Sequence, residues 1–82
     1  MTLEDAITEL CQRITTICPE AVLRIARASE EEASIRVYAP AGVETAIKAD
    51  THEYTIDLLT SEGLDVQVLV YDIATSLPPT ET

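Results

Sequence analysis

Phenylalanine and tryptophan are absent from this sequence of 82 residues, which contains only two glycines, two cysteines and one histidine. Without those large rings, the core has to be built from Ile, Leu, Val and Ala. Two isolated glycines cannot form the glycine-rich loop that cradles phosphates, so nucleotide binding of that kind is excluded. No apolar run approaches the roughly 18 residues of a membrane-spanning helix.

Basic residues are also scarce. Five Lys and Arg stand against 15 Asp and Glu, which gives a formal net charge of −10. Affinity for nucleic acids relies on neutralising phosphates with Lys and Arg, and anionic membrane surfaces attract basic segments. We therefore expect neither nucleic-acid nor membrane binding. The hydrophobic fraction of 46% is high enough for a folded domain, so general disorder is excluded as well.

The first residues and the cysteines favour a cytoplasmic location. Glu4 and Asp5 stand where a signal peptide would have basic residues and an apolar run. Cys11 and Cys18 lie in one predicted helix, about 10 Å apart along its axis, which is too far for a disulfide. We interpret both as small buried side chains.

Capping signals and apolar spacing predict a first helix that begins after Thr2. Thr2 is a suitable N-cap, and Asp5 completes an acidic version of the capping box. Apolar residues then recur every three or four positions, which is typical of an amphipathic helix; they are Leu3, Ile7, Leu10, Ile14 and Ile17. Pro19 ends the helix near Cys18.

Two short segments with alternating apolar residues predict an antiparallel hairpin. The first strand covers 21–28 and the second 33–39, joined by an acidic turn at 29–32. We expect Ile25 to lie opposite Val37, because a slip by one residue would set apolar side chains against polar ones. Arg24 would then lie opposite Tyr38 on the outer face of the hairpin.

The stretch 43–62 favours helix, but its apolar stripe is interrupted near Asp50. We therefore prefer two helices with a kink near Asp50 over one straight helix. Gly63 predicts a left-handed cap, followed by Leu64 as the hydrophobic contact of a Schellman motif. The last strand, over 65–73, has apolar residues on both faces, which fits a central position or an edge covered by a second subunit.

Together these elements predict one α+β domain over 1–74 and a flexible C-terminal tail over 75–82. Their order is helix, strand, strand, one or two helices, and strand. A three-stranded sheet with the helices on one face makes a two-layer sandwich and leaves the other face open. The pattern leaves the position of the last strand undecided, since it could pair with either member of the hairpin.

Catalytic and metal-binding motifs are missing around His52, the single histidine. The chain has no G-x-S-x-G or phosphate-binding loop, and Cys11, Cys18 and His52 do not have the spacing of a zinc site. We therefore predict no enzymatic activity, no metal and no cofactor. A small-ligand or metal-binding domain centred on His52 is the alternative.

The order of helices and strands over residues 1–73 resembles that of type II KH domains and of BolA-like proteins. The KH phosphate-binding loop carries G-x-x-G, where residues 40–43 here read P-A-G-V. BolA-like proteins place a histidine at the start of the helix before the last strand, and His52 lies about there, although Thr51 and Glu53 replace the basic neighbours found in that family. That resemblance implies iron–sulfur ligation by His52 with a glutaredoxin-type partner.

One asymmetry in charge points to an interaction surface. Three of the five basic residues fall in the predicted hairpin: Arg24, Arg27 and Arg36. If the helices cover one sheet face, the opposite face presents Arg and Tyr around a small apolar patch, a composition enriched at protein interfaces. The residues of this predicted surface are Val22, Arg24, Arg36, Tyr38, Leu69 and Tyr71.

We predict that the chain is a small, acidic, non-enzymatic interaction module or homodimer that uses this sheet face. Its partner is then another protein or a second copy of the chain. A further alternative is that the acidic residues of the helical stretch meet a basic partner; they are Glu44, Asp50, Glu53, Asp57 and Glu62.

Overall fold

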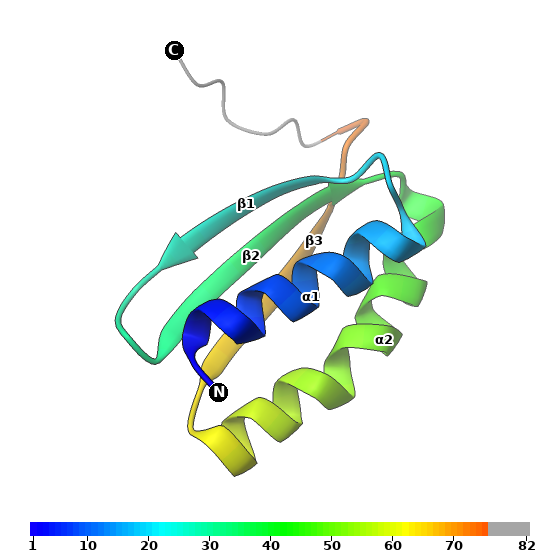
Figure 1. Ribbon diagram of the computed structural model, residues 1–82. Coiled ribbons are helices and arrows are strands. Elements are labelled where there is room, and N and C mark those ends of the chain that lie inside the picture. Colours follow the sequence, from blue (N-terminus) through cyan, green and yellow to red (C-terminus); the bar gives the residue numbers. More distant parts are fainter. Residues whose placement is uncertain (76–82) are drawn as a thin grey trace.

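The computed structural model describes residues 1–75 and shows a three-stranded mixed sheet with two helices packed on one face (Figure 1). The main elements are α1 (Leu3–Ile17), β1 (Val22–Arg27), β2 (Glu32–Ala39), α2 (Glu44–Asp57) and β3 (Asp65–Asp72). A 3-10 turn, η1 (Ala41–Val43), precedes α2, and a π-helical turn, η2 (Leu58–Glu62), follows it. The predicted two-layer α+β sandwich is confirmed.

The predicted start of α1 is confirmed by a complete capping box. The Asp5 N–H donates to the Thr2 hydroxyl oxygen at 3.2 Å, and the Thr2 N–H donates to a carboxylate oxygen of Asp5 at 3.3 Å. These two bonds satisfy backbone donors that a helix start otherwise leaves to water. Cys18 is the C-cap, which agrees with a stop before Pro19.

The predicted register between β1 and β2 is wrong by two residues. Ile25 lies opposite Ile35 rather than Val37, and Arg24 lies opposite Arg36. Because side chains alternate with a period of two, this shift leaves every side chain on its predicted face. It changes only which residues are neighbours across the strands.

A tighter turn than expected causes this shift. The backbone N–H groups of Ala28 and Ser29 both donate to the Glu32 carbonyl, at 2.9 and 3.2 Å. The Ser29 hydroxyl also accepts the N–H of Glu31 at 3.2 Å. Glu32 is therefore the first residue of β2 rather than the last of the turn. As a result, Arg24 does not face Tyr38, and the predicted pair between them is wrong.

β3 lies at the edge of the sheet, parallel to β2, in the order β1-β2-β3. Val66, Val68 and Val70 continue the inner face of the sheet, which packs against the helices. Of the two positions that the sequence allowed for this strand, the structure has the edge.

α2 is continuous through Asp50, so the predicted kink there is wrong. Its buried residues are Ile47 and Thr51, one turn apart. The Thr51 hydroxyl donates to the Ile47 carbonyl at 2.9 Å, which lets a polar side chain occupy a buried position without losing a hydrogen bond. Thr51 therefore interrupts the apolar stripe in the sequence, although its side chain is buried as an apolar one would be.

The predicted left-handed cap at Gly63 is confirmed, with a φ of 69°. The N–H groups of Gly63 and Leu64 both donate to the Leu58 carbonyl, a longer reach than a standard cap because η2 is wound as a π-helix. Leu58 and Leu64 are both buried, as expected for the apolar pair at such a cap.

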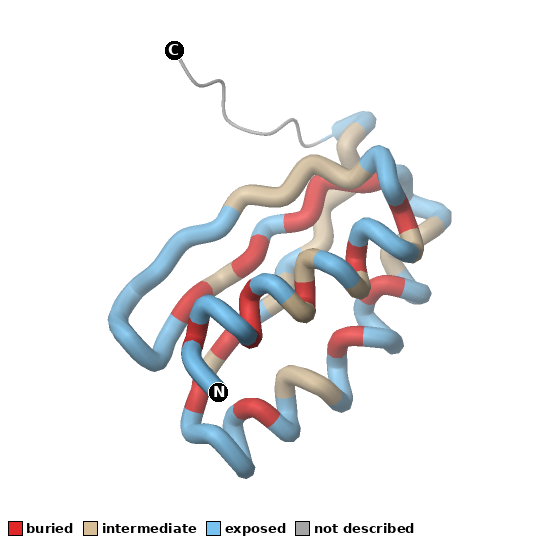
Figure 2. Tube along the Cα trace, viewed as in Figure 1, coloured by how far each residue is buried: buried red, intermediate tan, exposed pale blue. Residues whose placement is uncertain are grey.

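The core lies between the two helices and the inner sheet face (Figure 2). Its largest fully buried side chains are Leu10, Ile14, Ile35, Val37 and Ile47. Cys18 is buried beside them, while Cys11 is half-buried, and both are free thiols. Burial raises the pKa of the Cys11 thiol.

Two further expectations concern the ends and the environment of the chain. Apart from residue 75, the predicted tail over 75–82 lies outside the described residues. Within residues 1–75, no helix is long and apolar enough to cross a membrane.

Candidate functional site

The sheet face turned away from the helices, here called the open face, carries alternate side chains in rows across the three strands. One row contains Val22, Tyr38 and Tyr71, and the next contains Arg24, Arg36 and Leu69. The structure therefore brings together all six residues of the predicted interaction surface.

The aromatic row is held by a stacked pair. The rings of Tyr38 and Tyr71 have centroids 5.3 Å apart and planes 22° from parallel, within the range of favourable aromatic stacking. Tyr38, on the central strand, is only 6% exposed, whereas Tyr71 is half-buried. Tyr38 is thus buried and packs against the ring of Tyr71, whereas Tyr71 is accessible to a partner on one side.

The basic row sets two like charges side by side. Arg24 and Arg36 lie directly opposite on neighbouring strands, an arrangement that is unfavourable unless an anion compensates it. Arg36 is exposed and forms no ion pair with any residue between 1 and 75. Leu69 completes the row with 38% of its surface exposed. The row thus combines positive charge with apolar surface, and within residues 1–75 the charge of Arg36 has no ion-pair partner.

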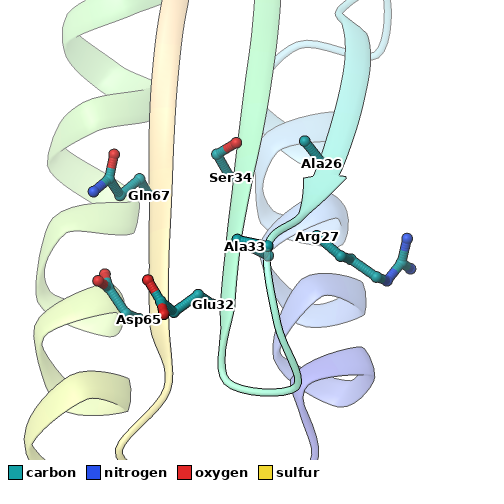
Figure 3. Close-up of a pocket in the computed structure, with 8 residues that line it drawn as sticks. Ala26, Arg27, Glu32, Ala33, Ser34, Asp65 and Gln67 are labelled. Carbon is teal, nitrogen blue, oxygen red and sulfur yellow. The ribbon is translucent and has the colours of Figure 1, made fainter.

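A shallow hollow of about 240 Å³ follows beyond the basic row (Figure 3). Its floor is a row of small and polar side chains, Ala26, Ser34 and Gln67. Glu32 and Asp65, opposite each other on β2 and β3, border it at the far end. Along the strands the open face therefore changes from aromatic to basic to acidic.

Arg27, the third basic residue of the hairpin, does not belong to the open face. Its guanidinium donates from Nε and Nη2 to the two carboxylate oxygens of Glu4, at 2.7 and 2.8 Å. These hydrogen bonds lower the pKa of Glu4 and raise the pKa of Arg27. Arg27 fastens β1 to the first turn of α1.

The acidic residues of the helical stretch, the further alternative from the sequence, are largely occupied by ion pairs. Glu44 pairs with Lys48 at 2.7 Å, and Glu62 pairs with the N-terminal amino group at 3.3 Å. Asp50 lies 3.7 Å from the guanidinium of Arg13. This stretch therefore offers less free negative charge to a basic partner than its sequence indicates.

Sequence reasoning missed the role of Arg13. Its guanidinium lies 4.6 Å from the centre of the Tyr54 ring, a cation–π contact between α1 and α2. Burial raises the pKa of Tyr54. No local pattern marks such a contact, since Arg13 and Tyr54 meet only when the two helices pack together.

His52 lies within α2 and lines a groove of about 400 Å³ between α2 and β3. Lys48, Thr51 and Thr55 share the helical side of this groove. Across residues 1–75, no three His, Cys, Asp or Glu side chains gather as a metal site would require. Within residues 1–75, His52 therefore lines a groove but is not part of a cluster of side chains that could hold a metal ion.

No protein-family model matches this chain, and neither the curated proteins nor the solved structures contain a match. The resemblance to type II KH domains and BolA-like proteins is therefore one of element order. Evidence for a function therefore comes from the side chains of the open face and from the sheet that holds them.

Proposed function

We propose that this domain is a non-enzymatic protein-interaction module whose open face binds another protein. The observation that carries the proposal is exposed Arg36, which lies in one row with exposed Leu69 and next to Tyr71. The partner surface that fits it presents a carboxylate within an apolar patch.

Arginine and aromatic side chains suit such a partner for separate reasons. A guanidinium binds a carboxylate through two parallel hydrogen bonds, which fixes orientation as well as adding affinity. A carboxylate of the partner would also pair with Arg36, which forms no ion pair within residues 1–75. Leu69 and Tyr71 supply apolar area that gains from removal of water.

Charge argues against stacking two copies of the chain through the open face. A two-fold axis through this face would bring the arginine pairs of the two copies close together. Each copy also has a net charge of −10, which opposes association at long range. A different protein is therefore the better occupant of this face.

Two free cysteines agree with a cytoplasmic site of action, where thiols stay reduced.

Photo-crosslinking tests the proposal. A photoreactive phenylalanine analogue is placed at position 71 on the open face and, as a matched control, at the exposed position 12 on α1. Each protein is irradiated in a cell extract, and crosslinked products are identified by mass spectrometry. We expect a product that forms from position 71 and not from position 12.

The captured protein is then purified and its binding measured directly. Leu69→Asp and Arg36→Glu should each weaken binding at least tenfold, whereas Thr8→Lys on α1 should not. Equal capture at both positions, or unchanged binding by both open-face variants, would contradict the proposal. Light scattering at two salt levels adds a check, because a dimer abolished by Leu69→Asp would mean that a second copy occupies this face.

A further inference from the structure

The outer edge of β3 has backbone groups that point away from the sheet. The N–H of Asp65 donates to Glu31 at 2.8 Å, and the N–H of Ile73 donates to Ala39 at 3.0 Å. In a parallel pair, alternate residues bond to the same neighbour, so the odd-numbered residues of β3 bond to β2. The N–H and C=O groups of its even-numbered residues therefore face outward: Val66, Val68, Val70 and Asp72.

The helical layer is wider than the sheet that it covers. Two packed helices span about 20 Å at a separation of 8–10 Å, whereas three strands about 4.8 Å apart span roughly 14 Å. Viewed from the open face, α2 projects beyond the edge of β3 (Figure 3). The difference in width is about that of one strand.

A groove occupies the place of that missing strand. It measures about 400 Å³ and lies between one side of α2 and residues 66–69 of β3. Its helical wall consists of Lys48, Thr51, His52 and Thr55. These side chains are polar, and none of them is a Phe, Tyr or Trp ring that would fill the space. A backbone laid along β3 would rest against α2.

The edge of β3 also lacks the usual protection against strand pairing. Lysine, proline and bulges are the common protective features, and the eight residues of β3 contain neither lysine nor proline. Its charges are confined to Asp65 and Asp72 at the two ends. β1, the opposite edge, is shorter and is tied to α1 through the Arg27–Glu4 ion pair.

We propose that the groove along β3 binds an extended segment of a partner protein, which adds to the sheet as a fourth strand. The outward groups of Val66, Val68 and Val70 would supply the backbone hydrogen bonds, as in other cases of strand addition. This site adjoins the open face at Leu69, but it relies on the backbone groups at the edge of β3, so the inference does not depend on the proposed function.

The surroundings of the groove define the chemistry of the segment. Side chains that turn toward α2 meet Thr51 and Thr55 and have to be small or hydroxylated. Alternate side chains continue the open face beside Leu69, so apolar residues fit there. Asp65 and Asp72 at the ends of β3, on a molecule of net charge −10, favour a basic residue at each end of the segment.

Amide hydrogen exchange with a synthetic peptide tests the inference. The probe is acetyl-Lys-Val-Thr-Val-Ser-Val-Thr-Lys-amide, and the control probe has the same side chains with N-methyl groups on alternate backbone nitrogens. In the free protein, we expect Leu69 and Tyr71 amides to exchange slowly and Val68 and Val70 amides to exchange fast. At about 1 mM probe, Val68 and Val70 should become at least tenfold slower, and the N-methylated probe should have no such effect.

Two variants of one residue separate strand addition from a general loss of stability. Val68→Pro removes an outward N–H but none of the bonds to β2, since proline is tolerated at an edge. Val68→Ala keeps that N–H and loses more of the side chain. Val68→Pro should abolish the protection of the Val70 amide, and Val68→Ala should retain it.

Three results would overturn the inference. The first is no change in exchange at Val68 and Val70 with about 1 mM probe. The second is equal protection by the N-methylated probe, which would mean that the side chains bind without strand pairing. The third is protection of Val68 and Val70 in the free protein together with a dimeric mass, which would assign the edge to a second copy. Arg36→Glu alters the open face and leaves the edge of β3 intact. It should therefore weaken binding at the open face but leave the peptide's protection of Val68 and Val70 unchanged, which separates a failure of this inference from a failure of the proposed function.

Discussion

Arg24 and Arg36 lie directly opposite each other on β1 and β2, although a shift of two residues would have separated them. The turn at Ser29 sets this register, and the register places the two positive charges side by side. Like charges opposite each other in a sheet are destabilising. A fold that keeps such a pair on its open face therefore loses some stability.

Replacing Arg36 should therefore stabilise the free domain. We expect Arg36→Thr to raise the free energy of unfolding by about 0.3 kcal/mol at low salt, since it removes the repulsion and threonine suits a strand. Urea denaturation at low and high ionic strength measures this. The gain should shrink at high salt, where the charges are screened. A loss of stability at low salt would mean that Arg36 has a favourable contact.

The two stacked tyrosines should differ in their contribution to stability. Tyr38 is 6% exposed and Tyr71 is half-buried, so Tyr38→Ala leaves the larger cavity. We expect a loss of about 3 kcal/mol for Tyr38→Ala and about 1 kcal/mol for Tyr71→Ala, measured by urea denaturation. Equal losses would contradict the difference in burial. Tyr71 is consequently the better position for probing the open face.

The two glycines form a matched pair for testing backbone strain. A Cβ at either position would meet no atom within 4 Å, but only Gly63 has a positive φ, of 69°. Gly63→Ala should therefore cost about 1 kcal/mol of stability from backbone strain alone. Gly42→Ala should be neutral or stabilise by up to about 0.5 kcal/mol. Thermal unfolding of both variants checks this, and a neutral Gly63→Ala would count against the left-handed cap.

The Glu4–Arg27 pair should leave a signature in pH titration. Hydrogen bonds from Arg27 lower the pKa of Glu4 below its value in the unfolded chain. The pair therefore stabilises the fold above the unfolded-state pKa, and the contribution is lost as the pH falls through the lower folded-state pKa. NMR titration of the Glu4 side-chain carboxyl should show this lowered midpoint.

Arg27→Gln is the control for that titration. It removes the charge that stabilises the Glu4 carboxylate, so the Glu4 midpoint should return toward the unfolded-state value. An unchanged midpoint in Arg27→Gln would show that another group lowers the pKa.

Local patterns predicted most of the secondary structure. The capping box at Thr2 and Asp5 and the cap at Gly63 depend on contacts within a few residues, so the sequence contains them in full. The alternation in 33–39 likewise predicted which side chains share the open face. The predicted kink at Asp50 was wrong because Thr51, a polar residue, resembles a break in the apolar stripe of the sequence. In the structure Thr51 is buried, since its hydroxyl donates to a backbone carbonyl of the same helix.

By itself, the sequence determined where the helices and strands form and on which face of the sheet each side chain lies, because both follow from spacing along the chain. Only the tertiary structure decided that β3 pairs with β2 at an edge, that Arg24 meets Arg36, and that Tyr38 is covered by its neighbours. A period of two fixes the face of a strand but not its partner, since registers two residues apart bury the same side chains. Turn closure and packing make that choice, and in this protein they create both the arginine pair and the open edge of β3.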